Sequence, residues 1–276
     1  MVLSKKVLVI IIISLIVGSI IGYYIYTHRG RGLVIVTFES EKSSYNMGEN
    51  VIIVAKVEAI NIDHFDIVAT SQYPNSDGIY LFYYPTFEEL KKAFAMLHNS
   101  SSHITGILSD YYSVIHINIT EKKIYKYVWN ATVFYRGDGP DTSHYYRAPA
   151  GYYLLYLQFV QWWRIGDYDV KFVYNNKSYF YLGGINYTLK NSILYINSSQ
   201  PLNFTGKLEI WQYHRTPPSK EYYKTIYFNY TGSGISINLS NYPEIYSVKR
   251  EYVIYMYTPY GKYMVGYYES PGSNKS

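Results

Sequence analysis

Side chains that could carry out chemistry are few in this chain. It contains no cysteine, which excludes a cysteine nucleophile, a cysteine-ligated zinc or iron–sulfur site and a disulfide scaffold. The seven histidines form no His-Glu-x-x-His pair, and the sequence holds neither a Gly-x-Ser-x-Gly elbow nor a phosphate-binding loop. We therefore predict no catalytic residue and no cofactor.

Two groupings of carboxylates and histidine could supply metal ligands. Residues 63–66 read Asp-His-Phe-Asp, but alternation along a strand turns adjacent side chains to opposite faces. Asp138, Asp141 and His144 lie in a turn-rich segment whose oxygens could bind Ca²⁺, but their spacing matches no calcium loop. We predict no metal site. Paired carboxylates for glycoside hydrolysis cannot be assigned from the sequence, so a hydrolase stays open as an alternative.

The N-glycosylation pattern Asn-x-Ser/Thr is the strongest chemical signal in the chain. Ten of the 17 asparagines carry it, whereas the content of Ser and Thr predicts roughly two or three by chance. These sequons begin at Asn99, Asn118, Asn130, Asn176, Asn186, Asn197, Asn203, Asn229, Asn238 and Asn274. Because N-glycans are added on the exofacial side of a membrane, we expect this part of the chain to lie outside the cytoplasm.

Residues 7–26 form an uncharged, apolar stretch that predicts a transmembrane helix. At 1.5 Å per residue such a helix spans about 30 Å, the thickness of the hydrocarbon core of a bilayer. A signal peptide cleaved between Gly18 and Gly22 is the alternative. Every sequon follows this stretch, so we predict that residues 1–6 are a cytoplasmic stub. The protein would then be a single-pass protein of the plasma membrane, or of a host or virion membrane, with the lipid bilayer as its first partner.

One face of the predicted membrane helix carries small residues. Ser14, Gly18 and Gly22 are spaced by four, and a Gly-x-x-x-Gly pair lets two membrane helices approach closely. We predict self-association through this face.

The net charge of +5 arises mainly beside the apolar stretch. Lys5, Lys6, Arg29 and Arg31 flank it, and the remainder of the chain is close to neutral. A nucleic-acid partner requires a basic stripe, which this sequence lacks, so we predict no nucleic-acid binding.

Runs of β-branched and aromatic residues at regular spacing predict a mainly β fold. The predicted organisation is a linker at 27–32, a first antiparallel β-sandwich domain at 33–182, a second, smaller one at 183–269 and a polar tail at 270–276. Gly183-Gly184 marks the boundary between the two domains. A single larger sandwich with insertions is the alternative.

One amphipathic helix is predicted at about 86–98, inserted in the first domain. Thr86 and Glu89 form a capping box, and Glu88 and Lys92 form a favourable i, i+4 pair. The apolar stripe consists of Phe87, Leu90, Ala93, Phe94 and Leu97. We expect this helix to be a connection packed across one sheet.

A short turn carries a resemblance to known modules. Residues 45–51 read Tyr-x-x-Gly-Glu-x-Val, which resembles the A–B turn of immunoglobulin-like and macroglobulin-like modules of prokaryotic surface proteins. The resemblance implies that Gly permits the turn, the acid stays in solvent and Tyr folds back on the sandwich edge. Residues 166–170 look like the penultimate strand of such a module, which residues 179–182 would follow in the same sheet. This resemblance bears on fold and not on activity.

Tyrosine contributes 38 of the 276 residues, while charged residues make up 16 %, against roughly 25 % in typical soluble domains. Doublets such as Tyr111-Tyr112 and Tyr152-Tyr153 would place one ring on each face of a strand, one in the core and one at the surface. Exposed rings suit glycan stacking or protein contacts, although Tyr also serves as an uncharged surface residue. Few charges, no Cys, many Tyr and dense sequons together resemble the composition of exported proteins of thermoacidophilic archaea and their viruses.

These observations predict a membrane-anchored extracytoplasmic glycoprotein with a binding or structural role at a cell envelope or virion surface. Its expected partner is an envelope protein or a glycan. One alternative is a membrane-tethered extracytoplasmic hydrolase acting on glycans or peptides. Another is a substrate-binding subunit with an aromatic cleft between its two domains.

Overall fold

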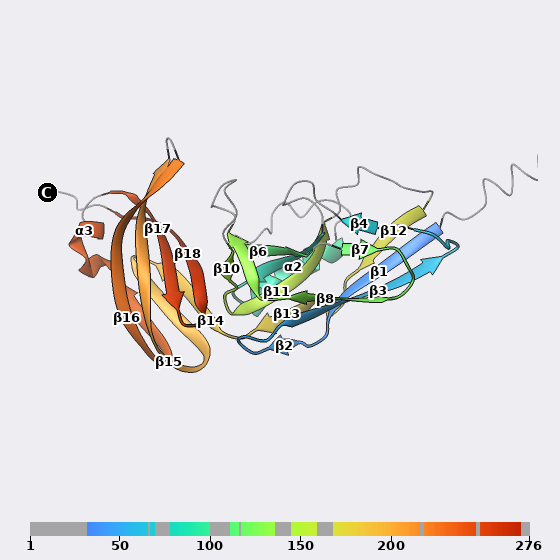
Figure 1. Ribbon diagram of the computed structural model, residues 1–276, viewed down its shortest axis with the longest axis horizontal. Coiled ribbons are helices and arrows are strands. Elements are labelled where there is room, and N and C mark those ends of the chain that lie inside the picture. The colour runs from blue at the N-terminus through green and yellow to red at the C-terminus, as the bar shows by residue number, and fades with distance from the viewer. Residues whose placement is uncertain are drawn as a thin grey trace, which may run out of the picture.

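The computed structural model describes residues 32–65, 67–69, 78–99, 111–115, 117–135, 145–158, 168–215, 218–246 and 249–271. These residues form a mainly β fold, as predicted (Figure 1). The predicted membrane segment at 7–26 lies outside them, as do the linker up to residue 31 and residues 272–276 of the polar tail. Within the part of the chain described, no helix has the length and apolar character needed to cross a bilayer.

Two large sheets and one two-stranded pair make up the first region, which we define as the described residues up to 182. The four-stranded sheet has the order β12 (Tyr168–Val173), β1 (Gly32–Ser40), β3 (Val51–Ile60) and β8 (Ile124–Trp129). The seven-stranded sheet has the order β10 (Tyr146–Arg147), β9 (Thr132–Tyr135), β6 (Tyr111–Ile115), β5 (Gly78–Tyr84), β11 (Gly151–Gln158), β13 (Tyr179–Leu182) and β2 (Ser44–Tyr45). A small antiparallel pair consists of β4 (Ile67–Ala69) and β7 (Ile117–Ile119).

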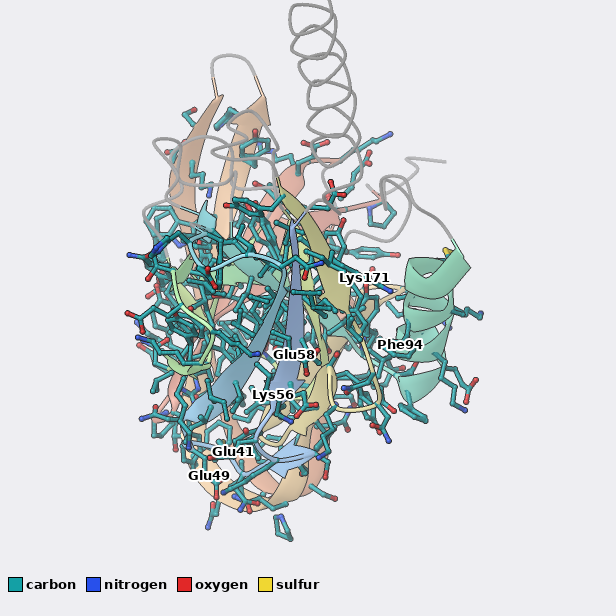
Figure 2. All side chains as sticks on the ribbon, turned by 90° about the vertical axis from the view of Figure 1, so that its right-hand side faces the viewer. Glu41, Glu49, Lys56, Glu58, Phe94 and Lys171 are labelled. Atoms are coloured by element: carbon teal, nitrogen blue, oxygen red, sulfur yellow. The ribbon has the colours of Figure 1, made fainter. Side chains whose placement is uncertain are left out.

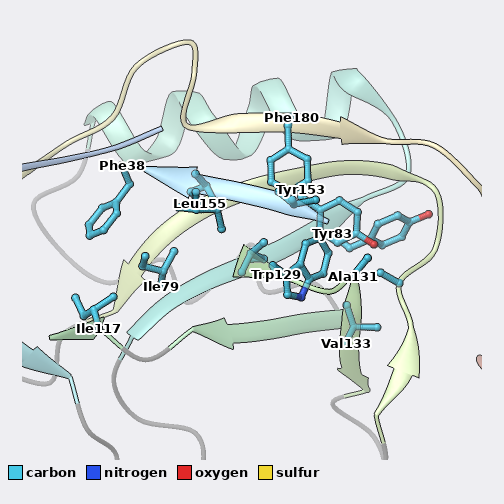
Figure 3. Close-up of a cluster of buried hydrophobic side chains, with 14 of the residues drawn as sticks. Phe38, Ile79, Tyr83, Ile117, Trp129, Ala131, Val133, Tyr153, Leu155 and Phe180 are labelled. Atoms are coloured by element: carbon cyan, nitrogen blue, oxygen red, sulfur yellow. The ribbon is translucent and has the colours of Figure 1, made fainter. Parts of the chain in front are cut away.

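A hydrophobic core joins these two sheets. Alternate residues of β1 are fully buried, which is the pattern of a strand with one face on a core and one face outward. The same core takes the inward residues of β5 and β11 from the facing sheet. At its centre Trp129 packs against Tyr153 and Phe180, with ring centroids 5.0 and 6.1 Å away (Figure 3).

Helix α2 (Phe87–Asn99) covers the other face of the seven-stranded sheet, as expected for a connection packed across a sheet. The backbone N–H of Glu89 donates to Thr86 Oγ1 at 3.3 Å, which confirms Thr86 as the N-cap. Leu90 and Ala93 pack on β5 from outside. Figure 2 shows α2 beside the sheets, with Phe94 on the side of the helix that faces them. The ion pair of Glu88 is with Lys91 and not with the predicted Lys92.

The turn at residues 45–51 has the geometry that its sequence implied. Gly48 has φ +89°, a conformation that favours glycine. Tyr45 is buried, and its hydroxyl donates to the carbonyl of Ile52 at 3.1 Å. Glu49 stays half-exposed and accepts hydrogen bonds from Asn46 and Lys42, which lower the pKa of its carboxyl.

The chain crosses between the two sheets at two places. The first is Ala131, whose φ of +55° turns the chain from β8 of the four-stranded sheet into β9 of the facing sheet. β13 was expected in the sheet of the preceding strand β12, but it joins the seven-stranded sheet instead. A turn at Asn175–Ser178, anchored by Ser178 Oγ donating to the carbonyl of Phe38, carries the chain across.

The second region, defined as the described residues from 185 on, contains one further sheet. Its strands are β14 (Ile185–Lys190), β15 (Ile193–Arg215), β16 (Pro218–Asn238), β17 (Glu251–Thr258) and β18 (Gly261–Glu269), with η2 (Leu239–Asn241) and α3 (Pro243–Tyr246) between β16 and β17. β15 pairs with β16 along one edge; on its other edge it pairs with β14 near its start and with β17 near its end. A change of sheet at Gly183-Gly184 therefore coincides with the predicted boundary.

β15 and β16 form one long hairpin. From Ile193 to Ile210 its ladder is interrupted only by a shift of register between Asn197 and Leu202. Pro201 lies in this shift, where its lack of an N–H costs no ladder hydrogen bond. β14, β15, β16, β17 and β18 share a second hydrophobic core.

Aromatic contacts join the two regions. Val253, Tyr255 and Met264 of the second region belong to the core of the first region. Tyr146 of β10 stacks on Tyr255 with centroids 5.9 Å apart, and the hydroxyl of Tyr111 on β6 donates to the carbonyl of Met264 on β18. The second region lies at one end of the molecule, and β1 begins at the opposite end (Figure 1).

The tyrosine doublets differ in whether one or both of their rings pack against a hydrophobic cluster. Tyr145 is exposed and Tyr146 buried, as predicted for one ring in the core and one at the surface. Tyr111-Tyr112 and Tyr152-Tyr153 instead place one ring against each of two hydrophobic clusters, because the seven-stranded sheet is covered on both faces.

Candidate functional site

The predicted site residues are divided between described and undescribed parts of the chain. Ser14, Gly18 and Gly22, the predicted helix-association face, lie outside the described residues, and so does Asn274. Asn99 is the last residue of α2, and its side chain is not described. The other eight sequon asparagines have described side chains.

These eight asparagines share one property: none of them is buried. Asn118, Asn130, Asn176, Asn197, Asn203 and Asn229 are exposed, and Asn186 and Asn238 are half-buried. Their immediate neighbours are often core residues, such as Ile196 and Phe228. Strand alternation therefore turns the asparagine outward and its neighbour inward.

Three of these asparagines have their amide oxygen held by a hydroxyl. Thr132 Oγ1 donates to Asn130 Oδ1 at 2.7 Å, and Ser240 Oγ donates to Asn238 Oδ1 at 2.7 Å. In these two cases the hydroxyl belongs to the same sequon, whereas Asn229 Oδ1 accepts from Thr205 Oγ1 of another sequon at 3.0 Å. These bonds fix the amide through its oxygen and do not use Nδ2, the atom to which an N-glycan is joined.

Four sequons lie on the outer face of the second region, the face turned away from its core, as two facing pairs. Asn186 lies directly opposite Asn197 across β14 and β15. Asn203 lies opposite Thr231, and Asn229 lies opposite Thr205, so that two whole sequons pair across β15 and β16. Directly opposed side chains on a sheet have Cβ atoms about 4.5–5.5 Å apart. This group is named the sequon patch: Asn186, Asn197, Asn203 and Asn229.

Next to the sequon patch, the same outer face carries lysines on tyrosine rings. Lys207 Nζ is 4.7 Å from the ring centroid of Tyr257. Lys262 Nζ is 4.2 Å from that of Tyr255 and 5.5 Å from that of Tyr146. Such cation–π contacts contribute about 0.5–2 kcal/mol each, depending on exposure. Lys262 therefore ties β18 to β10 of the first region.

Glu209 is the carboxylate within this lysine–tyrosine group. Burial acts to raise its pKa, but hydrogen bonds from Lys207, at 2.6 Å, and Tyr257 outweigh burial, so the pKa of Glu209 is lowered. Burial and the hydrogen bond to Glu209 raise the pKa of Tyr257. The group is thus an ion pair embedded in aromatic rings, an arrangement suited to contacts with sugars or with protein side chains.

Of the residues considered for metal binding, the structure describes only Asp63 and His64. Asp63 and His64 are both exposed, and Asp66 lies outside the described residues, as do Asp138, Asp141 and His144. In the described parts of the chain, no three His, Asp or Glu side chains come together as a possible metal site. Several described glutamates form ion pairs with lysines, as in the Lys56–Glu39 pair at 2.5 Å.

Sequence reasoning found the sequons but missed their arrangement. Pairing of Asn186 with Asn197, and of Asn203 with Thr231, depends on strand register, which the spacing along the chain does not reveal. The stacking of Lys262 on Tyr146 joins residues more than a hundred positions apart and left no local signal.

Comparison with known proteins adds no family to this description. No protein-family model matches the chain, and no curated protein matches its sequence.

Proposed function

We propose that this chain is a single-pass, membrane-anchored extracytoplasmic glycoprotein with a binding or structural role at a cell envelope or virion surface. In this proposal residues 7–26 are the anchor, and the two β-rich regions are sandwich domains of immunoglobulin-like character outside the membrane.

The observation that carries the proposal is the outward direction of the sequon asparagines. Eight described sequons are spread over turns, edges and strand faces, and in none of them is the asparagine buried. A bulky, polar glycan can be accommodated only where the asparagine reaches solvent. Surface exposure is common for asparagine in general. The stronger support is therefore the combination of exposure with a frequency of sequons well above chance.

The shape of the molecule is compatible with this topology. β1, the first strand after the proposed anchor, begins at the end remote from the second region (Figure 1). The sequon patch would accordingly project away from the membrane. In that position its glycans would not be obstructed by the bilayer.

Glycopeptide mass spectrometry on membranes or particles carrying the native protein tests the proposal. We expect sugar on several of the eight outward asparagines, resistance of the chain to alkaline carbonate extraction, and digestion of the second region by protease added outside. Asn→Gln at an occupied site should remove that glycan alone. A chain without sugar at any sequon, or one released by carbonate, would contradict the proposal.

The binding or structural role is tested by crosslinking on the same membranes or particles. Reproducible crosslinks from the lysine–tyrosine group to this chain or to an abundant envelope protein would support it. The matched variant Lys207→Met should lose the crosslinks made by that lysine. Hydrolysis of a glycan or peptide substrate by the purified chain would favour the hydrolase alternative instead.

A further inference from the structure

The exposed tyrosines divide into two groups by what their rings touch. Tyr145 packs on Phe134, Tyr222 on Trp211 and Tyr260 on Phe204, with ring centroids 4.4, 5.7 and 5.7 Å apart. Tyr195 and Tyr227 contact no aromatic ring among the described residues, although they are 41 % and 74 % exposed. Leaving an isolated tyrosine ring in water forgoes the stabilisation that burial of its apolar surface would give.

Both isolated rings precede a sequon asparagine by two residues. Tyr195 precedes Asn197 on β15, and Tyr227 precedes Asn229 on β16. The residue between each pair, Ile196 or Phe228, is buried in the core of the second region. Alternation therefore places each tyrosine and its asparagine on the same outer face, with Cα atoms about 6.5–7 Å apart along the strand.

Lys207 lies directly opposite Tyr227 on the ladder, and its ammonium donates to Glu209 and lies over the ring of Tyr257. Thr188 lies opposite Tyr195, and Thr205 lies opposite Asn229. Thr205 Oγ1 donates to Asn229 Oδ1 at 3.0 Å and so fixes the orientation of that amide. Its Nδ2 takes no part in this bond, and a sugar joined there would start beside the ring of Tyr227.

We propose that Tyr227 and Tyr195 are stacking platforms for the innermost sugars of glycans on Asn229 and Asn197. The ligand class is a pyranose that is N-linked through its anomeric carbon and carries several C–H groups on one face. That face would lie on the electron-rich face of the tyrosine ring, removing apolar surface of both from water. The inference rests on the proposed glycosylation and adds a structural role for two particular glycans.

The test is a double-mutant cycle on the full-length protein, isolated with its native glycans in detergent. Glycopeptide mass spectrometry first establishes occupancy of Asn229. Thermal unfolding is then compared for the wild type, Tyr227→Ala, Asn229→Gln and the double variant. We expect Tyr227→Ala to lower the unfolding midpoint by about 2–4 °C in the glycosylated protein and by less than about 1 °C in the Asn229→Gln background.

Matched variants separate stacking from other effects. Tyr227→Phe keeps the flat ring and should retain the wild-type midpoint. Tyr222→Ala removes an exposed tyrosine that has no sequon beside it, so its effect should be equal in both backgrounds. Hydrogen exchange along β16 is a second measurement that does not need reversible unfolding. It should show faster exchange around residue 229 in Tyr227→Ala only when the glycan is present.

The outcomes distinguish this inference from the proposed function. An equal effect of Tyr227→Ala with and without the glycan would overturn the stacking inference and leave glycosylation intact. Sugar on other sequons with none on Asn229 and Asn197 would also overturn it alone. A chain with no sugar at all would overturn both.

Discussion

Strands β5 and β16 are both rich in tyrosine, yet the structure uses the residue in opposite ways. All seven residues of β5 are buried, including Tyr80, Tyr83 and Tyr84. On β16 the burial alternates, so that Tyr230 is fully buried while Tyr227 is the most exposed large apolar side chain described.

The cause is the number of layers that cover each strand. β5 lies between the four-stranded sheet and α2, and both of its faces pack against hydrophobic clusters. β16 has the core of the second region on one face and solvent on the other. A sheet with one free face is the place where sequons and exposed rings can be displayed, and the sequon patch lies on such a face.

The largest effect should come from the doubly covered region. Tyr153 is fully buried, donates to the carbonyl of Pro149 at 2.7 Å and packs on Trp129. Tyr153→Ala should lower the free energy of unfolding by about 3–5 kcal/mol, measured by chemical denaturation. The contrasting change Tyr222→Ala, on the free face of β16, should cost less than about 1 kcal/mol. If both variants lost a similar amount of unfolding free energy, the proposed difference between a strand covered on two faces and a strand covered on one would be wrong.

A truncation in α2, the helix that covers the seven-stranded sheet, should have the next largest effect. Leu90 is 1 % exposed and fixes α2 to the seven-stranded sheet. Leu90→Ala should cost about 2–3 kcal/mol because it leaves a cavity over β5. Met96→Ala, on the exposed side of the same helix, should change the free energy of unfolding by no more than about 0.5 kcal/mol. If the two variants were equally stable, α2 would not act as a packed layer.

A smaller effect is expected where the two regions meet. Lys262→Met keeps the length of the side chain but removes the charge stacked on Tyr255 and Tyr146. We expect a loss of about 1 kcal/mol and faster hydrogen exchange in β10, measured by mass spectrometry. Lys123→Met removes a cation from the ring of Tyr125 within one region, and it should leave β10 unchanged. Unchanged exchange in Lys262→Met would show that the lysine does not couple the regions.

The smallest effect concerns acid pH. Burial acts to raise the pKa of Glu39, but hydrogen bonds from Lys56 and Asn175 outweigh it, so the folded-state pKa is lowered. A carboxyl with a lowered folded-state pKa stabilises the protein above its unfolded pKa of about 4.3, and this stabilisation is lost as the pH falls through the folded-state value.

We expect this contribution of Glu39 to stay below about 1 kcal/mol, because Lys56 is half-exposed. Denaturation of wild type and Glu39→Gln between pH 6 and pH 3 would measure it. The two stability curves should converge at low pH. Glu209→Gln offers the matching pair in the second region, whose carboxyl also has a lowered pKa. Stability curves of wild type and variant that stay parallel down to pH 3 would show that the carboxylate does not stabilise the protein in this way.

Local signals predicted much of the fold. Thr86 marked the start of α2 because its side chain caps the helix within three residues. Residues 45–51 folded as their sequence implied because Gly48 and Glu49 act through bonds within the turn itself. The change of sheet at Gly183-Gly184 likewise fell where two glycines interrupt the strand pattern. These features depend on neighbours in the chain, so the sequence carries them directly.

The candidate site was predicted only in part. The outward direction of the sequon asparagines follows from alternation, and Asn197 and Asn229 show it plainly. The facing of Asn186 with Asn197 and the isolation of Tyr227 do not follow from alternation. They depend on which strands pair and in which register, and register is set by the cores on both sides of the sheet.

The sequence by itself therefore determined the mainly β character, the position of α2 and the set of sequon asparagines. It did so because strand alternation, helix caps and sequons each depend on residues that are only a few positions apart in the chain. Tertiary structure alone decided which sheet each strand joins, as with β13, and which tyrosines are covered. A tyrosine ring is stable both in a core and at a surface, so its own chemistry does not choose between them. The presence or absence of a second layer, contributed by distant parts of the chain, makes that choice.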